Sequence, residues 1–169
     1  MKWLGTLLVL ASALAFGNRF CAEKKRHMHL LRDLLESLEL LQGELELRSA
    51  PIPELLHSLS EKASDDAGLF LGQVCEGLSR LGEDSFARIW SEAAASSLTL
   101  LLPGERDELV RLGAVLGSLD LEAQLRSLRF SSGFLRARLE EERKTYPVKR
   151  RLTLGLCASA AALTIILSL

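Results

Sequence analysis

The sequence predicts an all-α protein: a bundle of about six helices flanked by N- and C-terminal transmembrane helices. Leucines recur at the three- and four-residue spacing of an amphipathic helix over most of the chain. No segment alternates apolar and polar residues as a half-buried strand does, and no Asn-Gly or Asp-Gly hairpin turn occurs. Apolar residues make up 48% of the 169 positions and concentrate at both ends, which are therefore the candidate membrane segments.

The C-terminal segment is the clearer of the two. Residues 152–169 contain no charge over 18 positions. As a helix they would be roughly 27 Å long, close to the apolar thickness of a bilayer, about 30 Å. Lys149, Arg150 and Arg151 precede them and suit the membrane edge, where long cationic side chains can reach the headgroups. We predict a transmembrane helix within residues 148–169, with a buried core helix as the alternative.

The N-terminal segment allows two interpretations. Residues 3–17 are uncharged, so a span has to continue to about Ala22, whereas a signal peptide could be cleaved after Ala15. Basic residues follow at Arg19 and at 24–26, and basic residues directly after an apolar segment disfavour export. They favour an uncleaved anchor at residues 1–22. The positive-inside rule then places a domain of residues 23–147 in the cytoplasm and both termini outside.

The central region is acidic and shows no disulfide pattern. Residues 27–143 contain 21 Asp and Glu against 12 Lys and Arg, a net charge of −9. Such a surface should avoid nucleic acid and anionic lipid. Cys21, Cys75 and Cys157 form no C-x-x-C motif, as expected in a reducing compartment.

Two helices are predicted before position 64. The first runs from about Lys25 to Arg48, and "SAPIPE" ends it because each proline removes a backbone donor. Pro53 suits the first turn of the second helix, about Ile52 to Ala63. The apolar face of the first helix consists of Leu31, Leu34, Leu35, Leu38, Leu41 and Leu45.

The next two helices begin at capping residues. Ser64 and Asp65 precede a helix that stops near Gly82, and Asp84 is the expected cap of the following one. The inward residues predicted for the third helix are Ala67, Phe70, Leu71, Val74, Leu78 and Leu81. Those of the fourth are Phe86, Ile89, Trp90 and Ala93, with Trp90 interpreted as core.

A fifth helix begins near Pro103. Its first turn carries Glu105, Asp107 and Glu108, which suit the positive end of the helix dipole. A sixth helix runs from about Asp120 to Lys144. Its predicted inward residues are Leu121, Leu125, Leu128, Leu135 and Leu139.

The residues that could carry chemistry form no recognised catalytic pattern. His27 and His29 are two apart, so on a helix their rings diverge, and we interpret them as solvated. Residues 140–142, Glu-Glu-Glu, read as a solvated face. No P-loop, G-x-G-x-x-G, H-E-x-x-H or G-x-S-x-G occurs. We therefore assign no catalytic, cofactor-binding or metal residue and predict a protein that is not an enzyme; a hydrolase using scattered carboxylates is a distant alternative.

The stretch "RLGAVLGSLDLEAQLRSLR" predicts a tight corner between the fifth and sixth helices. Gly113 and Gly117 share a helix face, which would let another backbone approach closely. Gly117 is alternatively a left-handed glycine that ends the fifth helix. Asp120 then caps the sixth helix, and Gln124 lies one turn further on. These four residues are our candidates for a partner-docking corner.

At these residues the chain resembles the stage III sporulation protein AB family. The resemblance rests on "APIPELL" at 50–56 and on the pattern L-G-x-x-L-G-x-x-D-x-x-x-Q. Leu119 departs from the Ser or Thr usual in the family, which leaves Asp120 as the capping side chain. The pattern is matched by Leu112, Gly113, Leu116, Gly117, Asp120 and Gln124.

The resemblance implies a membrane platform protein of sporulation. Family members lie in the mother-cell membrane around the forespore, in a secretion-like channel complex. Their cytoplasmic domain is similar to the platform proteins of type II secretion and type IV pilus systems. The implied partners are a cytoplasmic secretion-type ATPase, stage III sporulation protein AA, and other membrane subunits of the channel. A homo-oligomer is left open, and an exported, signal-cleaved domain tethered by the C-terminal helix is the alternative.

Overall fold

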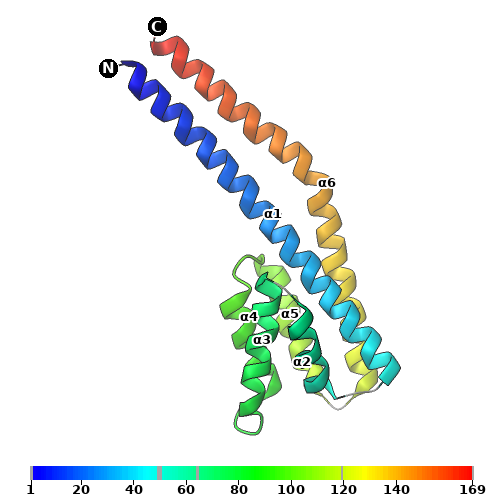
Figure 1. Cartoon of the computed structure of the whole chain (residues 1–169). Helices are drawn as coiled ribbons and strands as arrows, with labels where there is room; N and C mark the ends of the chain where they lie inside the picture. The colour runs from blue at the N-terminus through cyan, green and yellow to red at the C-terminus, as the bar shows by residue number, and fades with distance from the viewer. Residues whose placement is uncertain (1, 49–50, 64, 119, 169) are drawn as a thin grey trace. The chain divides into compact units, whose positions relative to one another are not determined.

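The computed structural model describes the backbone of residues 2–48, 51–63, 65–118 and 120–168, and side chains at 19, 22–47, 51–63, 65–118 and 120–145. In these ranges the chain is all-α, as predicted, with a single isolated bridge between Leu81 and Asp84. Figure 1 shows the six α-helices and one 3₁₀ turn in chain order. They are α1 (Lys2–Arg48), α2 (Ile52–Lys62), α3 (Asp65–Gly77), η1 (Leu78–Arg80), α4 (Phe86–Ser97), α5 (Pro103–Leu116) and α6 (Leu121–Ser168).

The chain divides into two compact units. The terminal unit comprises Met1–Met28 and Glu140–Leu169, and the bundle unit comprises His29–Leu139. The side chains of both predicted membrane segments, in residues 1–22 and 148–169, lie almost entirely outside the described residues. Within the part of the chain that the structure describes, no helix combines the length and the apolar character of a membrane span.

Two side chains of the terminal unit differ from their predicted environment. Glu142 is buried and its Oε1 lies 2.6 Å from Lys24 Nζ, and His27 is buried as well. The interpretation of both as solvated is therefore wrong. Their spacing gives the reason: Glu142 follows Leu139 by three residues and His27 precedes Leu31 by four, so each continues the inward stripe of its helix.

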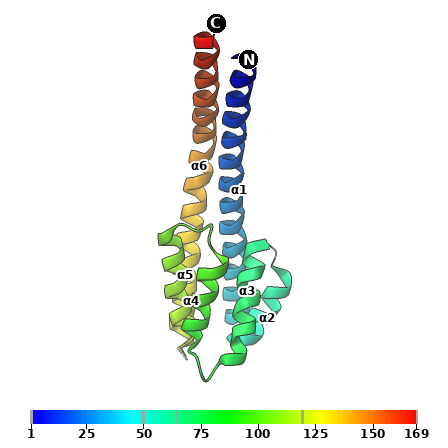
Figure 2. The same cartoon turned by 90° about the vertical axis from the view of Figure 1, so that its left-hand side faces the viewer.

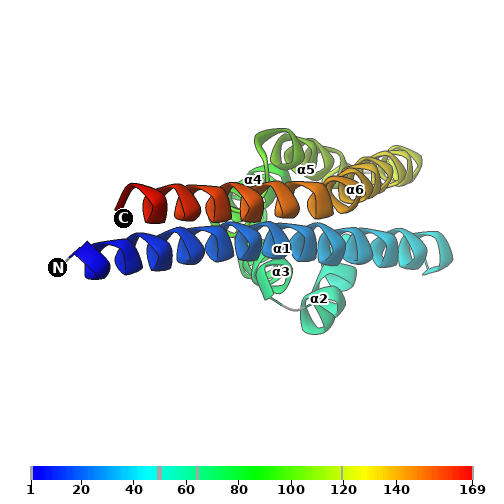
Figure 3. The same ribbon diagram turned by 90° about the horizontal axis from the view of Figure 1, so that it is seen from above.

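The core of the bundle unit follows the predicted apolar faces. All six leucines predicted for the inner face of α1 are buried. Figures 2 and 3 show α2 and α3 beside α1, and α5 beside α6. In addition α3 packs against α2 and α4, and α4 packs against α5. The four short helices thus form a continuous series of packed neighbours, α2–α3–α4–α5.

Helix ends are where predicted burial fails. Leu81 is 46% exposed and Leu121 39% exposed, and Leu78 and Leu125 are only half-buried. α3 ends at Gly77 and the chain continues as the η1 turn; Gly77 itself is required because a Cβ there would overlap Ile89 Cγ2 of α4. Leu81 therefore leaves the helical register that would have turned it inward.

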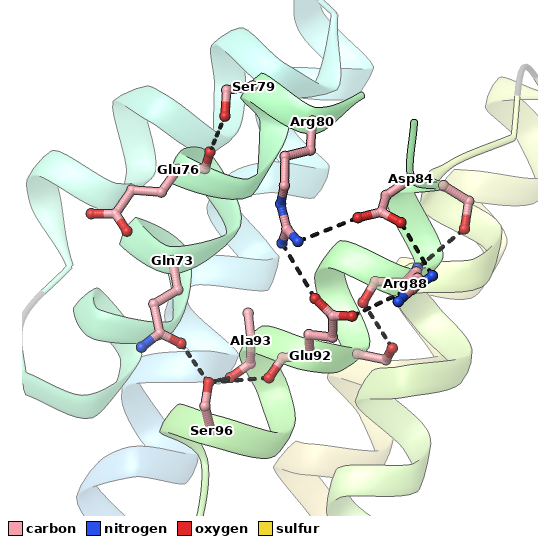
Figure 4. Close-up of polar contacts among 11 residues, drawn as sticks. Gln73, Glu76, Ser79, Arg80, Asp84, Arg88, Glu92, Ala93 and Ser96 are labelled. Carbon is pink, nitrogen blue, oxygen red and sulfur yellow. Dashed lines mark hydrogen bonds and ion pairs between the residues drawn. The ribbon is translucent and has the colours of Figure 1, made fainter. Parts of the chain in front are cut away.

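The turn from η1 into α4 is held by a charge ladder, which we define as Arg80, Asp84, Arg88 and Glu92. Each member follows the last by four residues. Asp84 lies 3.3 Å from both arginines, and Glu92 accepts from Arg88 Nε at 3.0 Å and from Arg80 at 3.3 Å (Figure 4). The prediction that Asp84 caps α4 is wrong: Ser85 is the cap, and its Oγ accepts from Arg88 N. The Asp84 carboxylate instead forms ion pairs with Arg80 and Arg88.

The same surface also ties α3 to α4 without charge. Ser96 Oγ and Ser97 Oγ each donate to Gln73 Oε1 at 2.6 Å. Gln73 lies on α3 and both serines are in the last turn of α4 (Figure 4 shows the Ser96 contact). The ladder thus joins η1 to the first half of α4, and the serine–glutamine contact joins α3 to the end of α4.

The ladder makes the stability of the fold depend on pH. Hydrogen bonds from Arg88 and Arg80 lower the pKa of Glu92 below its usual value of 4.5. A lowered folded-state pKa stabilises the fold above pH 4.5, and this contribution disappears as the pH falls through the folded value. We expect Glu92→Gln to lower the Tm of the full chain at neutral pH, and the difference from wild type to vanish in acid. Circular dichroism melts check this, with Glu76→Gln as control for net charge; a difference independent of pH contradicts it.

Candidate functional site

The predicted corner exists between α5 and α6, but Gly117 adopts a different conformation there. Gly117 has φ −75° and ψ −3°, in the right-handed region, so the predicted left-handed conformation is wrong. The end of α5 tightens instead: Gly117 N donates to Gly113 O at 3.3 Å and Ser118 N to Val115 O at 2.9 Å. Any residue can adopt these angles, so the glycines need another explanation.

Gly113 and Gly117 make room for aromatic side chains of α4. A Cβ at position 113 would overlap Cδ1 and Cγ of Trp90, and one at 117 would lie 3.1 Å from Phe86 Cβ. The two glycines share a face, as predicted. However, that face receives the rings of α4, whereas we had expected a second backbone.

Trp90 is the centre of this contact. It is fully buried, which confirms its interpretation as core, and its Nε1 donates to Leu109 O of α5 at 2.7 Å. Phe70 of α3 meets the indole edge-on at a centroid distance of 4.8 Å, and Phe86 lies 5.7 Å away. One ring therefore fixes α3, α4 and α5 together.

Asp120 and Gln124 each form hydrogen bonds with backbone groups of the corner. Asp120 is exposed and its Oδ1 accepts from Ala123 N at 3.1 Å, the predicted cap at the third helical residue. Gln124 is buried, and its Nε2 donates to Leu116 O at 3.0 Å and to Ser118 O at 2.5 Å. The first satisfies the start of α6 and the second satisfies carbonyls at the end of α5.

An apolar groove opens beside the corner, with a volume of about 450 Å³. We call it the corner groove. Four chain segments meet there: α1 near its end at Leu45, the start of α2, the η1–α4 turn and the corner itself. Its walls include residues 51–53, Leu81, Phe86, Gly117, Leu121 and Gln124. The two partly exposed leucines thus face one hollow, where they present apolar surface to solvent.

The corner groove lies at one end of the bundle unit. Leu45, which also lines it, follows His29 by 16 residues of continuous helix. The groove is therefore roughly 24 Å along α1 from the point where the chain enters the bundle unit. Gln124 is similarly far along α6 from Leu139, where the chain leaves it. The site is distant from the chain segments that lead to the termini.

Two acidic residues of α5 have a role that their sequence did not suggest. Glu105 is fully buried; its Oε2 accepts from Leu102 N at 2.9 Å and its Oε1 lies 3.4 Å from Arg138 Nε of α6. Glu108 accepts from Ser131 Oγ of α6 and from Arg111, both at 2.7 Å. The sequence places both in the first turn of the helix, where they suit its dipole, and predicts nothing about their burial. Their spacing from Leu109, Leu112 and Leu116 was the signal that they lie on the inward face.

The site offers binding surface. The polar side chains among its lining residues are those of Gln124 and Ser118. Gln124 already binds backbone carbonyls of the corner, and the rest of the wall is mostly apolar. Across the described residues, no group of three or more His, Cys, Asp or Glu is placed to hold a metal ion. What the corner groove can do is accept apolar side chains of a partner.

Comparison with solved structures shows this fold in another protein. The bundle is similar to a structure of "Stage III sporulation protein AB (SpoIIIAB)", with a TM-score of 0.62 and 18% sequence identity, over 70% of this chain and 94% of that one. No curated protein matches the sequence.

The profile of the family "Stage III sporulation protein AB (spore_III_AB)" matches residues 2–169. The chain therefore belongs to the stage III sporulation protein AB family, which confirms the resemblance found in its sequence and gives it a role in sporulation.

We call the space beside Gly113 that the indole of Trp90 fills the notch. It predicts that glycine-to-alanine substitutions at positions 113 and 133 have opposite effects on stability. Gly113→Ala inserts a methyl group into the indole and should destabilise the protein by about 1–3 kcal/mol. Gly133→Ala, in the exposed middle of α6 with no atom within 4 Å of the new Cβ, should stabilise it by about 0.5–1 kcal/mol. Urea unfolding of the full chain measures both; equal effects at the two sites would rule out the notch.

Proposed function

We propose that this protein is a non-enzymatic platform subunit of a secretion-like channel between mother cell and forespore. In this account two terminal helices anchor it in the mother-cell membrane around the forespore, with both termini outside. Residues 23–147 then face the cytoplasm and dock the secretion-type ATPase, stage III sporulation protein AA, beside other membrane subunits of the channel. The ATPase carries out the chemical reaction, and this chain holds the ATPase at the membrane.

The corner groove is the observation that carries the proposal. The residues of the family pattern, Gly113, Gly117, Asp120 and Gln124, shape the corner that forms one of its walls. If these pattern residues served only to pack the core of the bundle unit, an apolar groove open to solvent beside them would have no role. About 450 Å³ is within the usual range of binding pockets and can hold a few large side chains.

The location of the groove suits a soluble partner. It lies roughly 24 Å along α1 from the end of the bundle unit that leads to the predicted anchors. Along the chain the groove is therefore well separated from the predicted anchors, as a docking site for a cytoplasmic ATPase would be. The groove is smaller than a complete protein–protein interface, so the surrounding surface of the α2 and α6 ends must also take part.

Substitutions that introduce negative charge into the groove wall test the proposal. We expect Leu81→Asp/Leu121→Asp to weaken binding of the purified ATPase to the full chain in nanodiscs at least about tenfold, or 1.4 kcal/mol, because both apolar contacts are replaced by carboxylates. Both leucines are already partly exposed, so the fold should tolerate the change.

The control is Leu69→Asp, at a leucine that is 63% exposed on α3 and outside the groove. It should leave the Kd from biolayer interferometry unchanged. Unaltered affinity of the double variant, with its circular dichroism spectrum preserved, refutes docking at the groove. An equal loss in the control shows a general effect of added charge.

A further inference from the structure

We infer that the segment that docks in the corner groove is basic as well as apolar: large apolar side chains flanked by Lys or Arg. The inference rests on the proposed docking role of the groove and adds the chemistry of the docking segment. Its basis is a set of carboxylates around the groove, which we call the acidic rim: Glu54, Glu83, Asp120 and Glu122.

Each rim carboxylate is close in sequence to a residue that lines the groove. Glu54 follows Pro53, Glu83 is two residues beyond Leu81, and Asp120 and Glu122 flank Leu121. All four are exposed. Three of the four chain segments that line the groove thus carry a rim carboxylate within two residues of a lining residue.

The rim carboxylates are little paired with basic side chains. Among the described side chains, none forms an ion pair with Glu54, Glu83 or Asp120. Glu122 meets Arg126 at 3.4 Å, with the side chains 85% and 67% exposed, a pairing that solvent weakens. The nearby arginines, Arg80 and Arg88, are bound in the charge ladder. The groove is therefore an apolar hollow within a negative field.

The long helices of the bundle unit show how such carboxylates can be paired. Glu46 of α1 lies 2.7 Å from Arg129 of α6, and Glu39 of α1 pairs with Arg136 of α6. Glu54, Glu83 and Asp120 have no such partner among the described side chains and lie close in sequence to an apolar groove, so a partner with basic residues is the complement of this surface.

A second copy of this chain is disfavoured as the occupant. The bundle unit has 18 acidic and 11 basic residues, a net charge of −7, so two copies repel each other. Nucleic acid and anionic lipid are repelled for the same reason. Apolar contacts in the groove would supply affinity, and the rim would orient a basic segment and speed its arrival.

Photocrosslinking from the groove in sporulating cells tests the inference. Leu121→p-benzoylphenylalanine in the full chain should crosslink to a partner segment with apolar side chains and at least two Lys or Arg, identified by mass spectrometry. Leu69→p-benzoylphenylalanine is the control, because Leu69 is also an exposed leucine but lies outside the groove.

Rim charge provides the second readout. Glu54→Lys/Glu83→Lys should lower the crosslink yield at least about fivefold, because two attractions become repulsions. Glu36→Lys/Glu61→Lys, at exposed carboxylates outside the groove, should leave it unchanged. Thermal melts of each variant verify that the fold persists.

The outcomes separate the two proposals. A basic-apolar segment of the ATPase supports both, and one from another channel subunit supports the inference while overturning ATPase docking. A neutral or acidic segment, a second copy of this chain, lipid, or no yield above the Leu69 control overturns the inference. An acidic segment of the ATPase overturns the inference while leaving the proposed function intact.

Discussion

The seat of Trp90 in the notch at Gly113 is the contact on which the rest of the bundle unit depends. The indole fills the space that a side chain at 113 would occupy, and its N–H reaches Leu109 O at 2.7 Å. Because Phe70 and Phe86 pack on the same ring, α3, α4 and α5 share one reference point. The position of Phe86 in turn sets where Gly117 can lie. The end of α5, and with it one wall of the corner groove, therefore follows from the burial of one ring.

Buried polar groups then convert this packing into a fixed corner. Gln124 donates to two carbonyls at the end of α5, and Glu105 and Glu108 join α5 to α6 through Arg138 and Ser131. A buried carboxylate that loses its partners is costly, so these contacts hold α5 and α6 in one arrangement. The backbone that carries the partly exposed leucines of the groove is consequently fixed before a partner binds. Little conformational entropy of the groove is then lost on docking.

Much of this could be predicted where one physical cause dominates. Helical spacing predicted the buried face of α1 and the burial of Trp90, and the N-cap preference of Asp predicted the capping of α6 by Asp120. Gly117 shows the limit, because a left-handed turn and a close packing contact both require glycine and the chain itself does not distinguish them. The prediction for Glu142 was wrong, and the burial of Glu105 and Glu108 was not predicted, because carboxylates are usually solvated and only partners on distant helices make their burial favourable. Leu81 and Leu121 failed at helix ends, where periodicity no longer fixes direction. The groove depends on four chain segments spread from Leu45 to Gln124, so no local pattern could have revealed it.

The central claim, that the corner groove receives the ATPase, is tested most directly by hydrogen–deuterium exchange of the full chain in nanodiscs, with and without the purified ATPase. Our account predicts slower exchange in residues 51–56, 78–86 and 116–124, which surround the groove, and no change in residues 60–72 at the other end of α2 and α3. Binding with unchanged exchange around the groove, or with protection confined to residues 60–72, would contradict it.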